Sequence, residues 1–387
     1  EASDWIGGHT HTVDVQVEGR SYAIDTGFIV FNDWTYPNFI RLLEQIGVGF
    51  KPTEMSFSVS DPATGVEYNG HDLNTLFAQR SNLLSPAFWG MLRDILRFNR
   101  QSLDDLANNR ISADTTLGQY LDSNGYGRRF IEHYIVPMGS AIWSMSLADM
   151  LGFPLQFFVR FCKNHGLLSV SDRPTWQVIE GGSRSYVAPL TASFAERIRL
   201  NCPVSRVVRD QDGVTLHSAA GSERFDKVIF ACHSDQALAL LEQASEQERD
   251  ILGALPYANN DVVLHTDTRL LPKRKLAWAS WNYRLGEPRE QMAAVTYDMN
   301  ILQGIDSATT FCVSLNQTAA IDPNKILARF QYAHPQYSLA GTAAQARWEE
   351  LLGAQHTYYC GAYWANGFHE DGVVSALRVA RAFGETL

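Results

Sequence analysis

The first residues of the chain carry groups that could bind a nucleotide. An acid, Glu1, is followed by the glycine pair Gly7-Gly8 and by His9. In dinucleotide-binding βαβ units, an acid at the end of the second strand accepts hydrogen bonds from the adenosine ribose hydroxyls. The glycines would let the backbone pass close to such a ligand. An exposed acid before a glycine turn is also common without any ligand, so this segment alone leaves both interpretations open.

The last residues form a second candidate. A buried strand pattern over 357–361 leads into a polar and aromatic loop. Glu370-Asp371-Gly372 then open an apolar helix that we expect from Gly372 to about Phe383. The free N–H groups and positive dipole end of a helix hold anionic or electron-rich groups. Ordinary capping of this helix by Asp371 would produce the same pattern without a ligand.

Several elements must position these groups. Period-two alternation predicts a hairpin with strands at 12–17 and 21–25 around a turn at 18–20. Helical spacing predicts a helix from Pro37 that ends at Gly47, and another over 186–200 after Gly181-Gly182. Residues 204–209, 214–217 and 225–231 are expected to form three short strands, and 70–170 to be mainly helical.

Composition narrows the class of protein. The 387 residues are 45% apolar and 19% charged, which favours a folded protein of two domains. A net charge of −10 without a basic stripe argues against nucleic-acid binding. Five dispersed cysteines indicate reduced thiols. No apolar run approaches the ~18 residues of a membrane span, and no secretory signal is visible. We therefore expect a cytoplasmic protein, with peripheral membrane contact left open.

A metal site is not expected. His9 and His11 are two residues apart, and His369 precedes Glu370. No third ligand stands at a suitable spacing for zinc or another transition metal.

Taken together, the ordered motifs resemble those of flavin amine oxidases and phytoene desaturases. The nearest likeness is to bacterial amine-oxidase-like NAD/FAD-binding oxidoreductases, and it spans the whole chain. The motifs that carry the resemblance are Glu1-Ala2-x4-Gly7-Gly8-His9-Thr10-His11-Thr12, Asp25-Thr26-Gly27, Gly181-Gly182, Pro203-Val204, Trp278-Ala279-Ser280-Trp281-Asn282-Tyr283 and Gly361 through Gly372, which includes Gly367-Phe368-His369-Glu370-Asp371-Gly372.

The resemblance implies an α/β fold in which a discontinuous Rossmann-like FAD-binding domain carries an inserted α+β substrate domain. Residues 1–50, 172–255 and 353–387 would form the FAD-binding domain, and 51–171 and 256–352 the substrate domain. The family's Gly-x-Gly-x-x-Gly segment should precede Glu1 by roughly 25–35 residues. We therefore expect the first βα unit to be missing from this sequence and FAD binding to be weakened accordingly.

The resemblance also implies noncovalent FAD, because no Ser-Gly-Gly-Cys-Tyr attachment motif occurs. It assigns residues along the cofactor from the adenosine to the flavin: Glu1 to the ribose, Val204 to the adenine through its backbone, Gly7, Gly8 and His9 to the pyrophosphate, Gly27, Phe28 and Ile29 to the flavin surroundings, and Gly361, Asp371, Gly372 and Val373 to the phosphate, ribityl chain and pyrimidine edge. Two residues depart from the family: His9 stands where arginine is common, and Ala362 where many relatives have an acid.

The expected activity is removal of a hydride equivalent from a C–N or C–C bond of an amine or a lipid acyl chain. Relatives need no strong general base, and related domains occur fused to cyclopropane fatty acid synthases in plants. The weak catalytic candidates are Phe368 and Trp364, as an aromatic wall before the flavin, and Lys275 or Lys273, as the holder of a water at N5. Further pocket candidates are Trp281, Tyr283, Tyr297 and Asn300. For each of these residues, simple core packing or solvent exposure remains an alternative.

Two questions stay open at this point. The apolar stretches 87–92 and 153–158 could line a lipid entrance, touch a membrane, or form the core of the helical region. The alternative to an enzyme is a non-catalytic remnant or interaction module that has lost flavin binding. Nothing in the pattern indicates the oligomeric state.

Overall fold

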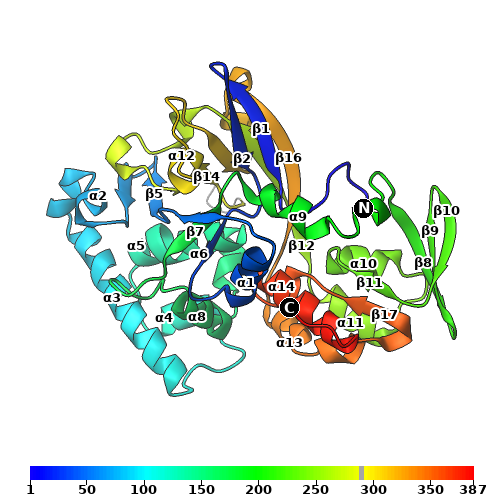
Figure 1. Ribbon diagram of the computed structural model, residues 1–387. Coiled ribbons are helices and arrows are strands. Elements are labelled where there is room, and N and C mark those ends of the chain that lie inside the picture. Colours follow the sequence, from blue (N-terminus) through cyan, green and yellow to red (C-terminus); the bar gives the residue numbers. More distant parts are fainter. Residues whose placement is uncertain (287–291) are drawn as a thin grey trace.

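A computed structural model describes residues 1–286 and 292–387 of the chain. It shows a mixed α/β fold, as expected. Figure 1 shows helices α2 to α8 gathered at the left and lower left, with strands β8, β9 and β10 at the right. The helices are α1 (Pro37–Gln45), α2 (Leu73–Leu76), α3 (Pro86–Ala107), α4 (Leu117–Ser123), α5 (Arg128–Phe130), α6 (Val136–Trp143), α7 (Leu147–Leu151), α8 (Leu155–Asn164), α9 (Val187–Thr191), α10 (Ser234–Leu240), α11 (Glu246–Gly253), α12 (Met299–Leu302), α13 (Leu339–Gln345) and α14 (His369–Ala382).

The largest sheet is mixed and has seven strands in the order β16-β12-β15-β14-β13-β5-β6. Its one parallel pair joins β13 to β5, and the other neighbours are antiparallel. The strands are β5 (Phe57–Asp61), β6 (Val66–Asn69), β12 (Tyr257–His265), β13 (Trp281–Arg284), β14 (Val295–Asp298), β15 (Cys312–Leu315) and β16 (Ile326–Pro335). Residues from both halves of the chain therefore build this sheet.

Smaller sheets complete the fold. A three-stranded sheet has the order β3-β7-β4, another has β10-β9-β8, and β11 pairs with β17 in parallel. Their strands are β3 (Val30–Asn32), β4 (Phe50–Pro52), β7 (Trp176–Ile179), β8 (Val204–Asp210), β9 (Gly213–Ser218), β10 (Gly221–Phe225), β11 (Val228–Phe230) and β17 (Thr357–Tyr359). The strand expected at 225–231 is confirmed as β11, although it is shorter than predicted and pairs with β17. Phe225 belongs instead to the end of β10, a strand that the sequence did not predict and that pairs with β9.

The N-terminal hairpin is confirmed. Strands β1 (Thr12–Val17) and β2 (Arg20–Asp25) pair in antiparallel register. Their connection has two residues, Glu18 and Gly19, with φ of 52° and 75°. Positive φ at both positions is the geometry that matches a tight hairpin turn to the twist of its strands.

The helix expected over 186–200 is shorter than predicted. Only Val187–Thr191 is α-helical, flanked by 3-10 turns at Ser183–Tyr186 and Ala195–Arg197. The Thr191 hydroxyl at the end of this helix donates to the Val187 carbonyl at 2.8 Å, a side-chain bond to the backbone that is typical of threonine in helices. The helix from Pro37 matches its predicted start and ends at Gln45, two residues before Gly47.

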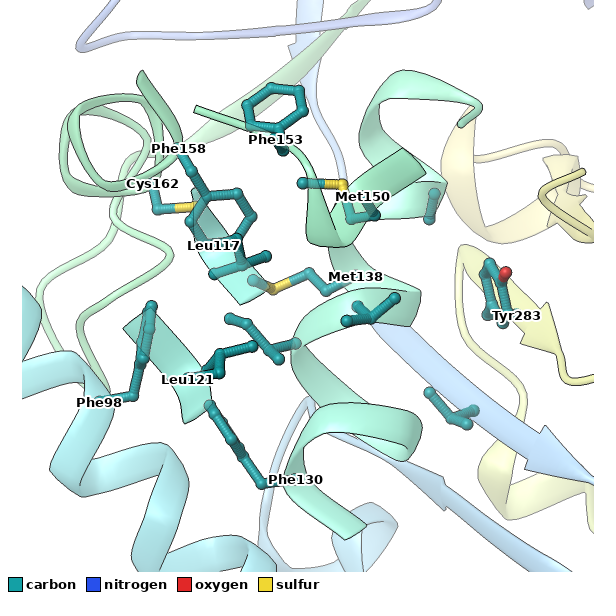
Figure 2. Packing of buried hydrophobic residues seen from close by; sticks show 14 of the residues in the cluster. Phe98, Leu117, Leu121, Phe130, Met138, Met150, Phe153, Phe158, Cys162 and Tyr283 are labelled. Carbon is teal, nitrogen blue, oxygen red and sulfur yellow. The ribbon is translucent and has the colours of Figure 1, made fainter. Parts of the chain in front are cut away.

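The helical region has its own apolar core. Figure 2 shows Phe98 of α3, Leu117 of α4 and Met138 of α6 converging with Phe153 and Phe158. These last two residues are fully buried. The stretch 153–158 is therefore core, and its alternative interpretation as a membrane or lipid-entrance segment is wrong. The residue boundaries of the two domains stay a prediction. None of the helices in the described ranges is both long and apolar enough to cross a membrane.

Candidate functional site

The backbone of residues 7–11 runs beside that of residues 26–28. The N–H of Phe28 donates to the carbonyl of His9 at 2.9 Å, and the N–H of Thr26 donates to His11 at the same distance. A Cβ atom at Gly27 would lie 2.1 Å from the His9 carbonyl oxygen. This close approach requires glycine at position 27, and it brings together two segments that the sequence predicted for the same ligand.

Asp25 ties this pair of segments to the rest of the protein. Its buried carboxylate accepts hydrogen bonds from the Thr12 hydroxyl at 2.6 Å, the Ser183 N–H at 2.9 Å and the Gln303 amide at 3.0 Å. Burial outweighs the bonds from Thr12 and Ser183 and raises the pKa of Asp25 to about 6. Sequence reasoning used Asp25 only as part of a motif, and an acid at the end of the predicted strand was the one available signal for this role.

Helix α14 begins at His369, three residues before the expected start at Gly372. Asp371 is therefore in the first turn, and the prediction that it precedes the helix is wrong. Its carboxylate reaches back and accepts the N–H of Phe368 at 2.9 Å and of Asn366 at 3.1 Å. An acid three positions after the cap stabilises a helix start in this way. Burial raises the pKa of Asp371 to about 6.

Glu370 joins α14 to α1. Its carboxylate accepts the backbone N–H of Asn38 at 3.2 Å, the Asn38 amide at 2.6 Å and the N–H of Phe39 at 2.9 Å. These groups belong to the first turn of α1, where a negative charge is favourable. The starts of the two helices are consequently held side by side. Sequence reasoning did not identify Glu370 as a bridging residue.

His369 occupies the centre of this region. Its ring lies 4.5 Å from the ring of Phe28 and stacks on Phe39 at 4.6 Å, measured between centroids. Burial lowers the pKa of His369 to about 3, so the imidazole is neutral at pH 7. Its Nε2 atom is buried and has no hydrogen-bond partner among the residues that the structure describes. No sequence motif indicated that His369 would be buried in this position.

Two further buried hydroxyls without a partner belong to the same surroundings. They are the hydroxyls of Tyr36 and Tyr337, again within the described part of the chain. Burial, with Asp371 nearby, raises the pKa of both tyrosines well above the ordinary value. Buried polar atoms are nearly always paired in native proteins, so these atoms near one helix start are candidates for contact with a bound molecule.

Beside this region, His9 lies in a cluster of rings. Its centroid is 4.9 Å from Tyr332, 5.6 Å from His233 and 5.7 Å from His334. Burial and the two neighbouring histidines lower the pKa of His9 to about 3. Across residues 1–286 and 292–387, no set of three or more His, Cys, Asp or Glu side chains is arranged to hold a metal ion.

Glu1 and Val204 lie together at the other end of the candidate site. The Glu1 carbonyl accepts the N–H of Cys202 at 2.9 Å, which places Glu1 close to the start of β8. Its exposed carboxylate accepts the N–H of Ser3 at 2.8 Å. Val204 is the first residue of β8, an edge strand of its sheet. Figure 1 shows the N-terminus near α10, to the right of α14.

The other cofactor candidates lie around α14 or beneath the hairpin. The N–H of Gly361 donates to the Ser375 hydroxyl at 2.8 Å, which fixes the end of β17 against α14. Gly372 and Val373 are in the first turns of α14, and Ile29 is buried in the core below β1 and β2. A Cβ atom at Gly8 or Gly372 would meet no neighbour.

The aromatic candidates divide into two groups. Phe368 stacks on Phe161 at 5.2 Å and faces His165 at 6.0 Å, next to the start of α14. Trp364 is buried in a different cluster, where its indole N–H donates to the Tyr359 carbonyl at 3.2 Å. The structure therefore does not bring Trp364 to the same position as Phe368.

The substrate-side candidates are also separated. Trp281 and Tyr297 of the large sheet form a T-shaped pair at 5.0 Å, and the Trp281 indole nitrogen is buried without a partner among the described residues. Tyr283 belongs to the helical core, as Figure 2 shows. The amide of Asn300 donates to the Thr309 carbonyl at 3.0 Å, a local structural bond.

The lysine candidates lie on the surface. Lys275 is exposed, with its amino group 5.6 Å from the centre of the Trp278 ring. Lys273 is exposed too, and its backbone N–H donates to Glu67 at 2.8 Å. Neither lysine contacts α14 or the hairpin through any bond in the described residues.

Solved structures with the same fold include two amine oxidases and a fatty acid isomerase. A putrescine oxidase variant superposes with a TM-score of 0.67 at 13% identity, covering 100% of this chain and 93% of that one. A fatty acid isomerase from P. acnes, which produces CLA, gives 0.68 at 14%, covering 99% and 92%. Cyclohexylamine oxidase from Brevibacterium oxydans gives 0.64 at 15%, covering 100% and 93%. At these identities the likeness establishes the fold.

Sequence comparison identifies the family. No curated protein is similar enough to this chain to count as a relative. A family model described as flavin containing amine oxidoreductase matches residues 1–299, which is more than half of the chain. FAD, bound noncovalently, is the cofactor of this family, in agreement with the sequence prediction. The chain belongs to the flavin containing amine oxidoreductases.

Proposed function

We propose that this protein holds FAD between the Glu1–Val204 end and the start of α14, and uses it to take a hydride equivalent from a C–N or C–C bond. The observation that carries the proposal is the buried, unpartnered Nε2 atom of His369. It stands at the N-terminus of a 14-residue helix, where free N–H groups and the helix dipole favour an electron-rich ligand.

The residues at this position fit the flavin end of FAD. The Phe28 and His369 rings, 4.5 Å apart, offer an apolar surface beside one polar atom. Gly27 lets the backbone of residues 26–28 approach that of His9 without a side chain between them. Glycines at positions 7 and 8, with φ of 113° and 55°, would keep the path toward Glu1 free of side chains.

When bound, FAD supplies the redox chemistry. The protein's part is to orient the substrate and exclude water. In this proposal Phe368, with Phe161 behind it, forms one wall of the substrate pocket. Trp281 and Tyr297 would supply a second wall from the large sheet, and the buried indole nitrogen of Trp281 could orient a polar substrate group.

The first experiment is a titration of the purified protein with FAD, followed by flavin fluorescence and absorption, for the wild type and His369→Leu. Loss of one hydrogen bond should weaken FAD binding by up to about tenfold. The same change should not destabilise the FAD-free protein, since it removes a buried polar atom without a partner. An unchanged affinity for FAD would contradict the placement of His369 at the cofactor.

The second experiment identifies the substrate class. Two of the similar structures are named for amines, putrescine and cyclohexylamine, and one for a fatty acid. We therefore propose testing primary amines, diamines and unsaturated fatty acids for anaerobic bleaching of the flavin band near ~450 nm. Failure of every class, together with failure to take up FAD, would favour the alternative of a non-catalytic interaction module.

A further inference from the structure

One edge of the molecule exposes large apolar side chains that its core does not use. Leu73 is 76% exposed, Leu83 46%, Leu84 87%, Trp89 49% and Leu96 58%. Single exposed apolar residues are normal, but a contiguous group marks an interaction surface. We call the surface formed by α2, residues 80–84 and the first half of α3 the α2–α3 edge; it lies at the far left of Figure 1.

Direct contacts make this edge one surface. The Trp89 indole N–H donates to the Leu83 carbonyl at 2.9 Å, and the Trp89 ring lies 5.4 Å from the ring of Phe77. The guanidinium of Arg80 donates to the Phe77 carbonyl at 2.8 Å and to the Asn74 carbonyl at 3.1 Å. The turn that carries Leu83 and Leu84 is thereby held against α3 with both leucines facing outward.

Helix α3 presents two different faces. Its inner face carries Phe88, Met91 and Phe98, which are buried in the helical core. Its outer face carries Trp89, Arg93, Leu96 and Arg100, which recur at helical spacing and are all exposed. Alternation of apolar and basic residues along the solvent face is typical of helices that lie in the plane of a membrane interface.

The charge of the edge is opposite to that of the whole protein. Residues 73–100 contain four arginines and one acid, Asp94, while the whole chain has a net charge of −10. Asp94 is buried and forms an ion pair with Arg97 at 3.3 Å. Within the described residues, Arg80, Arg93 and Arg100 form no ion pair. Their charges are available to anionic groups outside the molecule.

We propose that the α2–α3 edge docks onto an anionic lipid bilayer, with Leu83, Leu84 and Trp89 entering the boundary between headgroups and acyl chains. Apolar side chains would insert, and the arginines would meet the lipid phosphates. Tryptophan favours this boundary because its ring is apolar and its N–H is polar.

The main test is co-sedimentation of the whole protein with vesicles of phosphatidylcholine, with and without phosphatidylglycerol. Wild type should bind the anionic vesicles, and the double variant Leu83→Ser/Leu84→Ser should bind at least about tenfold more weakly. Val170→Ser is the matched control, because Val170 is 71% exposed outside this edge. Equal binding by wild type and the double variant would overturn the proposal, as would no binding by wild type.

The charge contribution is tested separately. Arg93→Gln and Arg100→Gln should each reduce binding to anionic vesicles by about fivefold at low salt, with the difference shrinking as salt is added. Arg381→Gln, at an exposed position in the last turn of α14, is the control. Equal binding to neutral and anionic vesicles would contradict the role of the arginines.

Trp89 provides a local readout. Brominated lipids quench the fluorescence of tryptophan at the headgroup–acyl boundary. Anionic vesicles that contain them should therefore reduce the tryptophan fluorescence of the wild type more than that of Trp89→Phe.

Sedimentation velocity without lipid tests whether a second copy of this chain is the occupant of the α2–α3 edge. A dimer that Leu83→Ser/Leu84→Ser converts to monomer, with no vesicle binding by the wild type, would assign the edge to self-association and overturn the proposal.

Discussion

The two ends of the proposed cofactor site are built differently. At the α14 end, His369 packs against Phe28 and Phe39, which lie more than 300 residues earlier in the chain. At the other end, Glu1 is exposed and is held through backbone bonds to residues 199–202.

This difference predicts different consequences of mutation. Interior polar groups at the α14 end are desolvated in the folded state, so substitutions there change the free energy of unfolding or its pH dependence as well as ligand binding. The exposed Glu1 can be changed with little cost to folding, so an effect there reports on the ligand alone.

The largest effect is expected at Asp25. Asp25→Ala removes the acceptor for Thr12, Ser183 and Gln303, and leaves buried donors unpaired. Each such group costs about 1–3 kcal/mol, so the free energy of unfolding should fall by about 3 kcal/mol or more. Urea denaturation measures this. The control is Asp14→Ala in the same hairpin, where Asp14 forms only an exposed pair with Arg184. Equal losses in the two variants would contradict the difference between interior and surface.

His369 should make stability depend on pH. Its folded-state pKa is about 3, below the ordinary value of 6.5, so the unfolded chain binds more protons between these limits. Protonation of His369 therefore does not lower the free energy of unfolding above pH 6.5. Below that pH it lowers the free energy of unfolding by about 1.4 kcal/mol per pH unit.

The measurement is the free energy of unfolding of wild type and His369→Leu at several pH values between about 4 and 6. In His369→Leu, the slope of the free energy of unfolding against pH should be smaller by the contribution of one bound proton. A slope that is the same in wild type and His369→Leu would show that His369 is not desolvated in the folded protein.

Gly372→Ala separates stability from binding. A Cβ atom there meets no neighbour, and alanine in a helix stabilises it by about 0.5–1 kcal/mol relative to glycine. If Gly372 contacts the cofactor, as the family resemblance implies, the same variant binds FAD more weakly. Gly90→Ala in α3, also without a neighbour, should give the gain in stability without a change in FAD affinity. Thermal unfolding and FAD titration read out the two effects.

The smallest effect on stability is expected at Glu1. Glu1→Gln should change the free energy of unfolding by less than about 0.5 kcal/mol, because the side chain is exposed. A lost charged hydrogen bond to the ribose should nevertheless weaken FAD binding by about tenfold or more. Asp4→Asn, three residues away and also exposed, is the control. Unchanged FAD affinity in Glu1→Gln would remove Glu1 from the proposed site.

Local features were predictable from the sequence. The hairpin at 12–25 follows from strict alternation and a turn at Glu18-Gly19, and the helix at Pro37 from spacing and a proline in the first turn. The start of α14 was misplaced because Asp371 acts from within the first turn, which sequence alone does not distinguish from a position before it. The roles of the substrate-side residues were harder to predict, because a pattern of aromatic residues does not distinguish side chains of the core from side chains that line a pocket.

By itself, the sequence determined the family, the α/β class and the order of the motifs, because these depend on residue types at short spacing. Only the tertiary structure decided that Glu370 caps α1, that Asp25 holds Gln303, and that His369 is buried beside Phe28. Each of these contacts joins segments more than 250 residues apart. Burial and the pKa shifts that follow from it are properties of packing between such segments, and no local pattern in the chain encodes them.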